Sequence, residues 1–532
     1  MKTERVKIAK RSDLKKGESK TISLDDKSII LLNHKGTYYA LETNCSHHNA
    51  GLVKGIVSDK SIICPLHHAK FSLEGGQLEE PPGLDGIFRY DVEIEGEDIY
   101  VNLPETQTRE NSFPNVTAKH SPSNSSHYAI VGAGAAGAAA AETLRKNGFD
   151  GKITLITKEN QLPYDRTILS KQYLQNKKTL RRIPYRNEDF YRKLKIDLLL
   201  GKNAEFVNTE KKVIEFYDDQ IKYDKLLIAP GSSPICPDLP GSTLKNIFTL
   251  RTLEDANTIF EAAEKSKKLV IVGASFIGLE CTAILIEKGI EVIVVEMEAV
   301  PFEAVLGYEL GKIIQGLHED KGVTFRLDTK VKAFKGDNEV KKVELDDSTE
   351  IDADMVILGM GVSPDTNILA KSYLDNNSSV KVDEYMRMKN ADGTLFAAGD
   401  IVSFDYKYTG ENIRIAHWRM AEQQGIVAAL NMMSPGYTFD KIPFFWTEQY
   451  DFHLSYLGHA QNWDETIING DLSHAFLMYY LKNNQLHAVA GKDRLRELCI
   501  IEECIRLHML PPVEKIKKGE VDWESIYKNH LM

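Results

Sequence analysis

Two short clusters of cysteine and histidine are the residues of this chain best suited to redox or metal chemistry. They read Cys45-Ser46-His47-His48 and Cys64-Pro65-Leu66-His67-His68, so each supplies one thiol and nearby imidazoles. Two thiolates and two imidazoles on facing loops suit a [2Fe-2S] cluster with cysteines on one iron and histidines on the other. A structural zinc ion is the alternative, but zinc fingers place their two cysteines together and their two histidines together. The mixed pairs therefore favour the iron–sulfur cluster.

The stretch that must position these clusters, residues 1–103, alternates short β-rich runs with turns, a pattern typical of a small antiparallel β-domain. The runs are Ser28 to Leu32, Tyr38 to Leu41, Ser61 to Cys64, Arg89 to Ile94 and Ile99 to Leu103. The region resembles the Rieske family, and further matching residues are Gly51, Pro65, His68 and Phe71. The resemblance implies four cluster ligands, Cys45, His47, Cys64 and His67. High-potential Rieske proteins carry an extra cysteine in each loop; this module has none, so we expect a ferredoxin-like cluster of low potential.

A glycine-rich turn follows a short apolar run and precedes an alanine-rich helix. It reads Gly132-Ala133-Gly134-Ala135-Ala136-Gly137. Gly132 allows the tight turn, Gly134 lets the backbone approach a pyrophosphate, and Gly137 lets the helix pack on the strand. The free N–H groups of the helix N-terminus favour phosphate, and Glu159 after the next strand is placed to hold ribose hydroxyls. This order of elements predicts a dinucleotide site.

A second unit of the same kind begins with the run Leu269 to Val272, followed by Gly273, Ser275 and Gly278. Ser275 stands where the close-approach glycine usually lies, but its side chain is small enough for the pyrophosphate to fit. Glu296 ends the next strand, where a carboxylate accepts ribose hydroxyls and repels a 2′-phosphate. The second unit therefore predicts NADH in preference to NADPH.

Residues 127–532 resemble the oxygenase-coupled ferredoxin reductases and the apoptosis-inducing-factor-like flavoproteins. The segments that carry the resemblance are Gln161 to Lys171, Tyr223 to Pro234, Val356 to Pro364, Leu395 to Asp400 and Pro443 to Asp451. It implies FAD contacts from Gly132, Gly134, Ala135, Ala136, Gly137, Lys158, Glu159, Arg166, Lys171 and Asp400. It implies NAD contacts from Gly273, Ser275, Gly278, Glu296 and Gly361. It makes Trp446 a candidate flavin lid and electron exit.

Each of these assignments has a plainer alternative. Arg166 and Lys171 could form a solvated basic face, Asp400 could be a turn or helix-capping residue, and Trp446 could belong to an aromatic core. Pro230 replaces the family's usual threonine, so we assign the loop from Tyr223 to Pro234 no binding role. The family resemblance also pairs Glu280 with Lys171 beside the flavin, and we hypothesise that this ion pair helps to place the nicotinamide.

Composition limits the remaining classes of function. The formal net charge is −11 and the pI is about 5.8, which argues against sequence-independent nucleic-acid binding. Six cysteines in 532 residues fit a reducing, cytoplasmic compartment, and we expect Cys499 and Cys504 to be packed thiols. The first residues show no apolar signal region, and no membrane span is predicted.

We therefore predict a multidomain protein: an N-terminal all-β domain, two Rossmann-like α/β domains and a C-terminal α+β domain. The expected boundaries are 1–103 for the Rieske domain, 104–126 for a flexible linker, 127–246 with 375–440 for the FAD domain, 247–374 for the NAD domain, and 441–532 for the C-terminal domain. The linker is rich in Pro, Ser, Thr and Asn, so we expect it to tether the cluster module without a permanent interface.

The expected function is transfer of electrons from NADH through FAD to the Rieske cluster and on to an external acceptor. That acceptor could be an oxygenase, a ferredoxin or a small molecule, and the resemblance leaves a homodimer open. The alternative is a redox-responsive switch of the apoptosis-inducing-factor type with slow turnover.

Overall fold

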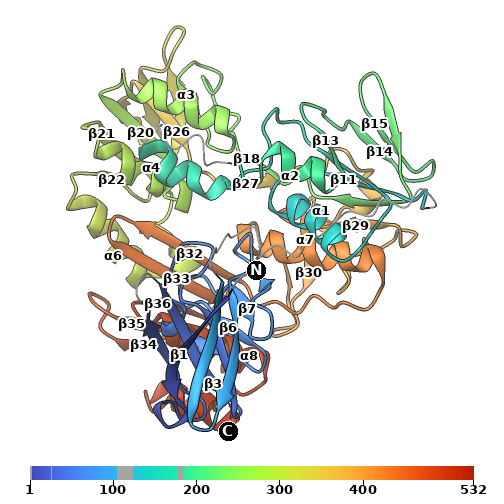
Figure 1. The fold of residues 1–532 in the computed structure, drawn as a ribbon. Coiled ribbons are helices and arrows are strands. Elements are labelled where there is room, and N and C mark those ends of the chain that lie inside the picture. The colour runs from blue at the N-terminus through green and yellow to red at the C-terminus, as the bar shows by residue number, and fades with distance from the viewer. Residues whose placement is uncertain (1–2, 25–26, 105–123, 176–183, 532) are drawn as a thin grey trace.

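A computed structural model describes residues 3–24, 27–104, 124–175 and 184–531 of the chain (Figure 1). It contains an all-β N-terminal part, two α/β parts built on parallel sheets, and a C-terminal antiparallel sheet with helices. The predicted fold class is confirmed.

The N-terminal part consists of two antiparallel sheets. The larger has the order β1-β10-β9-β4-β3-β2, with strands Thr3–Lys10, Asp98–Pro104, Arg89–Glu95, Thr37–Glu42, Ser28–His34 and Ser19–Ser23. The smaller has the order β5-β6-β7-β8, with strands Ile56–Val57, Ser61–Ile63, Lys70–Ser72 and Leu78–Glu80. Cys45 follows β4, and Cys64 follows β6. Both cysteines are buried in the core between the sheets, so the two Cys/His loops are anchored on their inner side.

The FAD part is a parallel sheet in the order β13-β12-β11-β17-β29. Its strands are Ile196–Leu199, Lys152–Ile156, His127–Val131, Lys225–Ile228 and Leu395–Ala397. The helices are α1 (Ala135–Lys146), α2 (Glu188–Lys193) and α7 (Trp418–Met433). Small additional sheets contain β14–β16 (Phe206–Asn208, Val213–Glu215, Gln220–Lys222) and β28, β30 and β31 (Val380–Lys381, Val402–Asp405, Asn412–Ile413). Buried alanines on α1 and Gly425 on α7 let these two helices pack closely, which brings the middle of α7 against Ala136 of the glycine-rich turn.

The NAD part repeats the arrangement with a parallel sheet in the order β19-β26-β20-β21-β22. Its strands are Ile247–Phe248, Met355–Leu358, Lys268–Val272, Glu291–Val295 and Thr324–Arg326. Its helices are α3 (Leu253–Ala263), α4 (Phe276–Ile286), α5 (Glu303–Leu306) and α6 (Tyr308–Glu319), and an antiparallel sheet adds β23–β25 (Val331–Lys335, Lys342–Leu345, Glu350–Asp352). A two-stranded ribbon of β18 (Ser232–Pro234) and β27 (Val362–Pro364) joins it to the FAD part.

The C-terminal part is an antiparallel sheet in the order β32-β33-β36-β35-β34. Its strands are Phe444–Gln449, Phe452–Gly458, Gln485–Lys492, Phe476–Lys482 and Glu465–Gly470. Its helices are α8 (Leu495–Arg506), α9 (Val513–Lys517) and α10 (Trp523–Leu531). Shorter turns of helix elsewhere are η1 (Arg11–Asp13), η2 (Leu52–Lys54), η4 (Arg166–Ile168), η7 (Lys371–Tyr373) and the π-helical η5 (Leu169–Tyr173).

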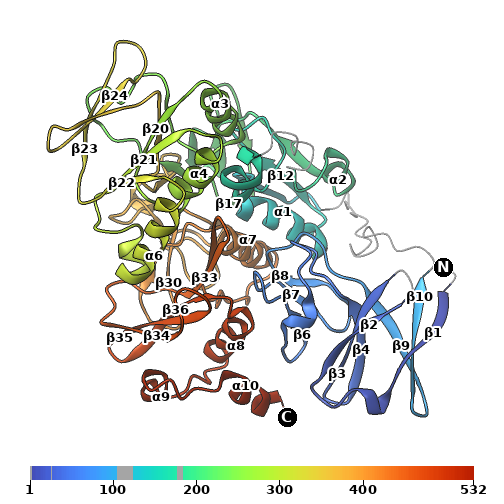
Figure 2. The same cartoon turned by 90° about the vertical axis from the view of Figure 1, so that its left-hand side faces the viewer.

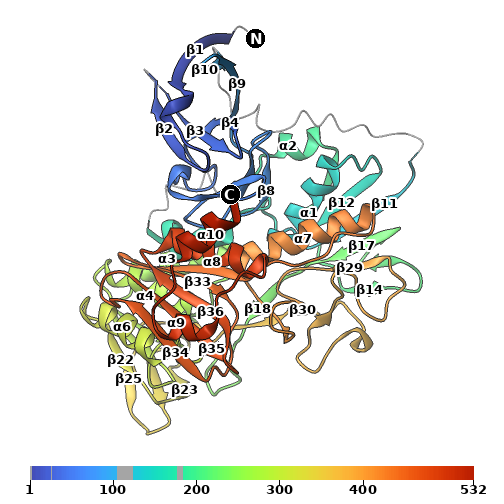
Figure 3. The same ribbon diagram turned by 90° about the horizontal axis from the view of Figure 1, so that it is seen from below.

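The N-terminal part lies against the rest of the molecule through its smaller sheet. Figures 2 and 3 show β6–β8 facing α7 and α8, while the larger sheet extends outward. Ile56 and Ile63 share one hydrophobic core with α8, and the Tyr527 hydroxyl donates to Val57 O at 3.2 Å. Most of the predicted linker, residues 105–123, lies outside the described residues. We expected the linker to tether the Rieske domain without a permanent interface. The structure instead shows a buried interface between the Rieske domain and the reductase, made of apolar and charged side chains from both parts.

Within the part of the chain that the structure describes, no helix is long and apolar enough to cross a membrane.

Candidate functional site

The two Cys/His loops have the same backbone hydrogen bonds, although their sequences are spaced differently. In the first loop Cys45 N–H donates to Ala50 O, and Asn49 N–H donates to Cys45 O, at 2.8 and 3.0 Å. The second loop repeats both bonds at the same offsets, from Cys64 to Ala69 O and from His68 to Cys64 O, at 2.9 and 3.0 Å. Asn49 and His68 both have positive φ, of 58° and 60°. The loops are therefore two copies of one turn.

The side chains of the four predicted ligands meet between these loops. His47 Nδ1 lies 3.1 Å from His67 Nδ1, and the two cysteine side chains are buried beside each other. Burial lowers the pKa of His47 to about 3 and that of His67 well below its ordinary value, so both rings are neutral. The contact with Cys45, together with nearby backbone N–H groups, lowers the pKa of Cys64. Neutral imidazoles and an acidified thiol are the forms that bind metal.

A cluster with two irons fits this donor set better than a single ion does. The two cysteine sulfurs form one pair and the two facing Nδ1 atoms form another, as mixed Cys/His ligation of a [2Fe-2S] cluster requires. The ligand assignment itself stays a prediction.

Strand β32 lies directly against the histidines of the second loop. The Trp446 ring is 4.0 Å from the His67 ring between centroids, and the Phe444 ring stacks on His68 at 4.1 Å. Residues two apart on a strand point to the same face, so Phe444 and Trp446 both face the cluster loops. Trp446 is also 5.5 Å from the ring of His417, which precedes α7. The candidate electron exit therefore lies between a predicted cluster ligand and the start of the flavin-domain helix.

The residues of β32 that alternate with them, among them Thr447, face the opposite way. Thr447 Oγ1 donates to Glu280 Oε1 at 3.3 Å, and Lys171 Nζ lies 2.8 Å from Glu280 Oε2. Ser170 Oγ donates to the same oxygen at 2.5 Å. The hypothesised ion pair with Lys171 is therefore present. It is almost fully buried on the Glu280 side and lies where the FAD, NAD and C-terminal domains meet. Its role in placing the nicotinamide stays a prediction.

The three glycines of the first turn differ in what surrounds them. Gly132 has φ +103°, and a Cβ there would lie 1.9 Å from Ala229 O; at Gly137 it would lie 1.8 Å from Gly132 O. A Cβ on Gly134 would meet no protein atom within 4 Å, so the backbone is open at the place predicted for the pyrophosphate. His417 Nδ1 is buried without a hydrogen-bond partner among the described residues. Open backbone and an unsatisfied nitrogen fit a bound dinucleotide.

The other predicted FAD residues form two hydrogen-bonded groups. The Glu159 carboxylate accepts from Arg166 Nη2 and, at 2.8 Å, from the Tyr164 hydroxyl. Lys158 is instead exposed, with Nζ 3.4 Å from Asp365 Oδ2.

Asp400 shows what sequence reasoning missed. Its Oδ2 accepts from Ser232 Oγ at 2.6 Å and from Arg251 Nη2 at 2.9 Å. Ser232 belongs to the loop that was assigned no binding role, and Arg251 carries no local motif. The loop therefore orients Asp400.

In the second nucleotide unit, Ser275 acts as the N-cap of α4, and its Oγ accepts from Gly278 N–H at 3.2 Å. Glu296 Oε2 accepts from Ala274 N–H at 2.5 Å, which places the carboxylate beside the turn. Gly361 has φ +89° and is open, since a Cβ there would meet only Ile235 Cδ1, at 3.9 Å. A negatively charged group beside an open turn fits a nucleotide with free ribose hydroxyls.

Comparisons with known proteins agree with this arrangement. Family models match for the Rieske [2Fe-2S] domain (residues 4–91), the pyridine nucleotide-disulphide oxidoreductases (126–425) and the reductase C-terminal domain (444–524). The chain is 37% identical to human (Homo sapiens) apoptosis-inducing factor 3, over 90% of this chain and 80% of that protein. It is 33% identical to the 3-phenylpropionate/cinnamic acid dioxygenase ferredoxin–NAD(+) reductase component of Photorhabdus laumondii, over 70% of this chain and 94% of that protein. The crystal structure of the covalent putidaredoxin reductase–putidaredoxin complex matches with a TM-score of 0.71 and 27% identity, over 76% of this chain and 99% of that one.

Proposed function

The chain belongs to the pyridine nucleotide-disulphide oxidoreductase family and carries a Rieske domain, and from this premise we propose which residues move electrons through it. It is a ferredoxin-reductase-like oxidoreductase whose cofactors are FAD, a Rieske [2Fe-2S] cluster and NAD(H). When bound, FAD accepts two electrons from the nicotinamide and can release them singly to a one-electron iron–sulfur centre. The residue roles below are our proposals.

We propose that Cys45, His47, Cys64 and His67 hold the cluster. For FAD, the backbone from Gly132 to Gly137 binds the pyrophosphate, and Glu159, Arg166 and Asp400 hold the remainder. Lys158 can contact FAD only if its exposed side chain breaks its ion pair with Asp365 and rotates toward the cofactor.

On the nicotinamide side, the turn at Gly273, Ser275 and Gly278 binds the pyrophosphate, with Gly361 beside it. Glu296 selects NADH, because its carboxylate beside the turn repels a 2′-phosphate. The Lys171–Glu280 ion pair would help to place the nicotinamide beside the flavin. Comparison of kcat/KM for NADH and NADPH in Glu296→Ala tests the first role: an unchanged ratio contradicts it.

Lys171→Ala tests the second role. We expect slower bleaching of the flavin by NADH in anaerobic stopped flow, because Glu280 loses the cation that fixes it. Lys152→Ala, which removes an exposed lysine of β12 outside the assigned sites, is the matched control. An unchanged rate in Lys171→Ala contradicts the assignment.

The observation that carries the proposal is the position of β32 between the two redox sites. One face of the strand presents Trp446 to His67, and the other presents Thr447 to Glu280. The strand therefore lies between the two proposed centres and places an aromatic ring beside a predicted cluster ligand. The fused Rieske domain would then take the place that a separate ferredoxin has in a reductase–ferredoxin pair, and an external acceptor receives the electrons from it.

The acceptor class is an oxygenase component, a ferredoxin or a small molecule. We also propose a cytoplasmic location, because none of the six cysteines, all of them in the described part of the chain, forms a disulfide, and Cys236 is exposed. A homodimer is part of the proposal, and sedimentation of the purified chain tests it.

An anaerobic NADH titration followed by visible absorbance and EPR tests the function. Flavin bleaching should precede a reduced-cluster signal with the low average g value of mixed Cys/His ligation. A flavin that NADH reduces, beside a cluster that never becomes reduced, would contradict the relay. A long-lived reduced flavin with negligible turnover on ferricyanide would favour the slow redox switch instead.

A further inference from the structure

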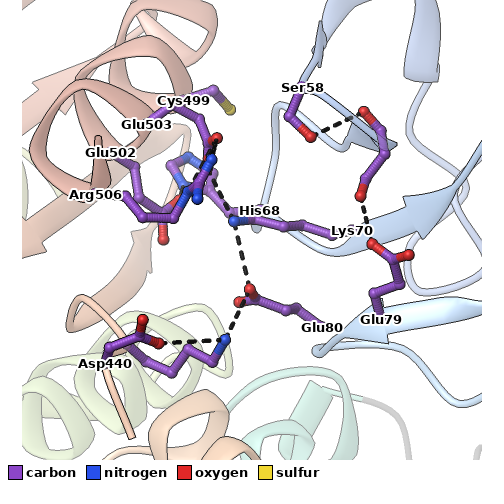
Figure 4. A network of polar contacts seen from close by, with 12 residues as sticks. Ser58, His68, Lys70, Glu79, Glu80, Asp440, Cys499, Glu502, Glu503 and Arg506 are labelled. Carbon is purple, nitrogen blue, oxygen red and sulfur yellow. Dashed lines mark hydrogen bonds and ion pairs between the residues drawn. The ribbon is translucent and has the colours of Figure 1, made fainter. Parts of the chain in front are cut away.

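The interface between the Rieske domain and the reductase contains a buried network of charges. Figure 4 shows Lys70 extending from the Rieske sheet between two acidic side chains, with Nζ 2.9 Å from Glu503 and 3.4 Å from Glu80. Lys441 adds a second cation, 3.1 Å from Glu80. His68 hydrogen-bonds Glu502 in the same network. Buried charges are tolerated only when they are paired, so these contacts require the two domains to be docked.

Arg419 lies at the centre of this network and is fully buried. Its Nε donates to Pro81 O at 3.0 Å, and its Nη2 donates to His68 O at 3.4 Å. Its terminal nitrogens also face Glu502 Oε1 at 3.3 and 3.4 Å. One guanidinium therefore joins the second ligand loop and the end of β8 in the Rieske domain to α8 in the C-terminal domain.

The position of Arg419 in the chain connects this contact to the flavin domain. It is the second residue of α7, and His417 immediately precedes that helix, 5.5 Å from the Trp446 ring. A displacement of the guanidinium thus moves the second loop relative to both α7 and Trp446.

We propose that Arg419 is a positioning residue for electron transfer: it fixes the loop from Cys64 to Ala69 so that the His67 ring stays in contact with the Trp446 ring. The inference rests on the proposed relay from flavin to cluster. Arginine suits this role because its planar fork can serve several acceptors at once, whereas the ammonium group of lysine is a single point charge. No described contact places Arg419 in the nucleotide or flavin sites, so its effect should be confined to the second half of the relay.

The test compares Arg419→Gln and Arg419→Lys with the wild-type full chain in anaerobic stopped flow. Flavin reduction by NADH should stay within about twofold of wild type, while the following cluster reduction should slow by about tenfold or more in Arg419→Gln. Arg419→Lys should lie between, since it keeps the charge but loses the fork. Arg192→Gln removes an exposed arginine of α2 and should leave both phases unchanged.

Hydrogen exchange gives a readout that does not depend on turnover. Amides of residues 64–69 should exchange faster in Arg419→Gln, whereas those of residues 45–50 should not. FAD content and NADH–ferricyanide activity show whether each variant has folded; if Arg419→Gln does not fold, Arg419→Lys carries the test.

A wild-type rate of cluster reduction in Arg419→Gln would overturn the proposal, as would equal slowing of both kinetic phases. If the wild-type flavin itself fails to reduce the cluster, the proposed relay fails instead, and the two failures are distinguishable.

Discussion

The two ligand loops share one backbone turn but are held by different parts of the molecule. The first loop is fastened inside its own domain, where Ser46 Oγ donates to Asp85 O at 2.6 Å. The second is fastened by the reductase: Glu502 hydrogen-bonds His68, Arg419 donates to His68 O, and Cys499 Sγ donates to Cys64 O at 3.6 Å. The first loop is thus hydrogen-bonded directly by its own domain, and the second is hydrogen-bonded directly by the FAD and C-terminal domains.

This asymmetry means that docking and cluster environment are linked. A ligand loop whose hydrogen bonds come from a second domain keeps its geometry only while the domains are in contact. Separate ferredoxins must satisfy such groups themselves. Fusion allows the reductase to satisfy them, and the contact with Trp446 is gained at the same time.

The largest effect is expected when a predicted cluster ligand is removed. Loss of a ligand from either loop should have the same result, although the two loops are held by different domains. Cys45→Ala and Cys64→Ala should each abolish the cluster, because both cysteines are assigned to the same iron. EPR and visible absorbance should lose the cluster signal completely, while bound FAD and NADH–ferricyanide activity persist.

His48→Ala is the control for the ligand variants, since His48 lies outside the assigned set. Retention of a normal cluster in Cys45→Ala would show that the first loop does not supply the ligand. Loss of the cluster in His48→Ala would also contradict the assignment.

The next prediction separates the loops. Glu502→Gln removes the nearer carboxylate partner of the buried Arg419 and leaves only Glu80, at 3.6 Å; breaking a buried ion pair typically costs about 3–5 kcal/mol. Ser46→Ala removes one neutral hydrogen bond from the first loop and should cost about 1 kcal/mol. Urea unfolding followed by tryptophan fluorescence measures both. Equal losses in the two variants would show that the loops are held with similar strength.

The sequence predicted the parts of this molecule that depend on local rules. Strand runs such as Glu291 to Val295 follow from apolar periodicity, and Gly132 and Gly137 occupy positions where a Cβ would overlap the backbone. The alternation of Phe444 and Trp446 could also have indicated a shared face, although it could not say what that face contacts.

The docking network could not be predicted in this way. Arg419 and Pro81 are 338 residues apart, and His68 and Glu502 are 434 apart, so no spacing rule connects them. Sequence alone predicts that an arginine in the first turn of a helix is exposed. Arg419 is buried only because the Rieske domain packs against this end of α7. Ser232 and Arg251, which hold Asp400, were missed for the same reason.

Acid should weaken the buried charge network beside the second loop more than the neutral hydrogen bond that holds the first loop. Burial alone would raise the pKa of Glu80, but Lys70, Lys441 and Arg419 outweigh both burial and the repulsion from Glu502 and hold it at about 2, below its ordinary 4.5. Because this pKa is depressed by folding, its stabilisation is complete above about pH 4.5 and is lost as pH falls toward 2. The contribution is on the order of 3 kcal/mol.

Urea unfolding of wild type and Glu80→Gln between pH 6 and 3 measures this effect. The free energy of unfolding should fall more steeply with acid in the wild type than in the variant, which has no carboxylate to protonate. Parallel curves would contradict the role of Glu80. Glu93→Gln, on the outer sheet of the Rieske domain, is the matched control.

The smallest expected effect concerns the thiol of Cys499, which is a weak donor to the carbonyl of a ligand residue. Cys499→Ala and Cys504→Ala both remove a buried sulfur from α8, so both should cost about 1 kcal/mol of stability. Only Cys499→Ala removes the S–H donor beside the second loop, and this donor stabilises the more negative, reduced form of the cluster. The midpoint potential of the cluster in Cys499→Ala should therefore fall by on the order of 20 mV, equivalent to about 0.5 kcal/mol for one electron. Cys499→Ser keeps a donor and should restore the potential; an equal shift in Cys504→Ala would show that packing, not this hydrogen bond, sets the difference between the loops.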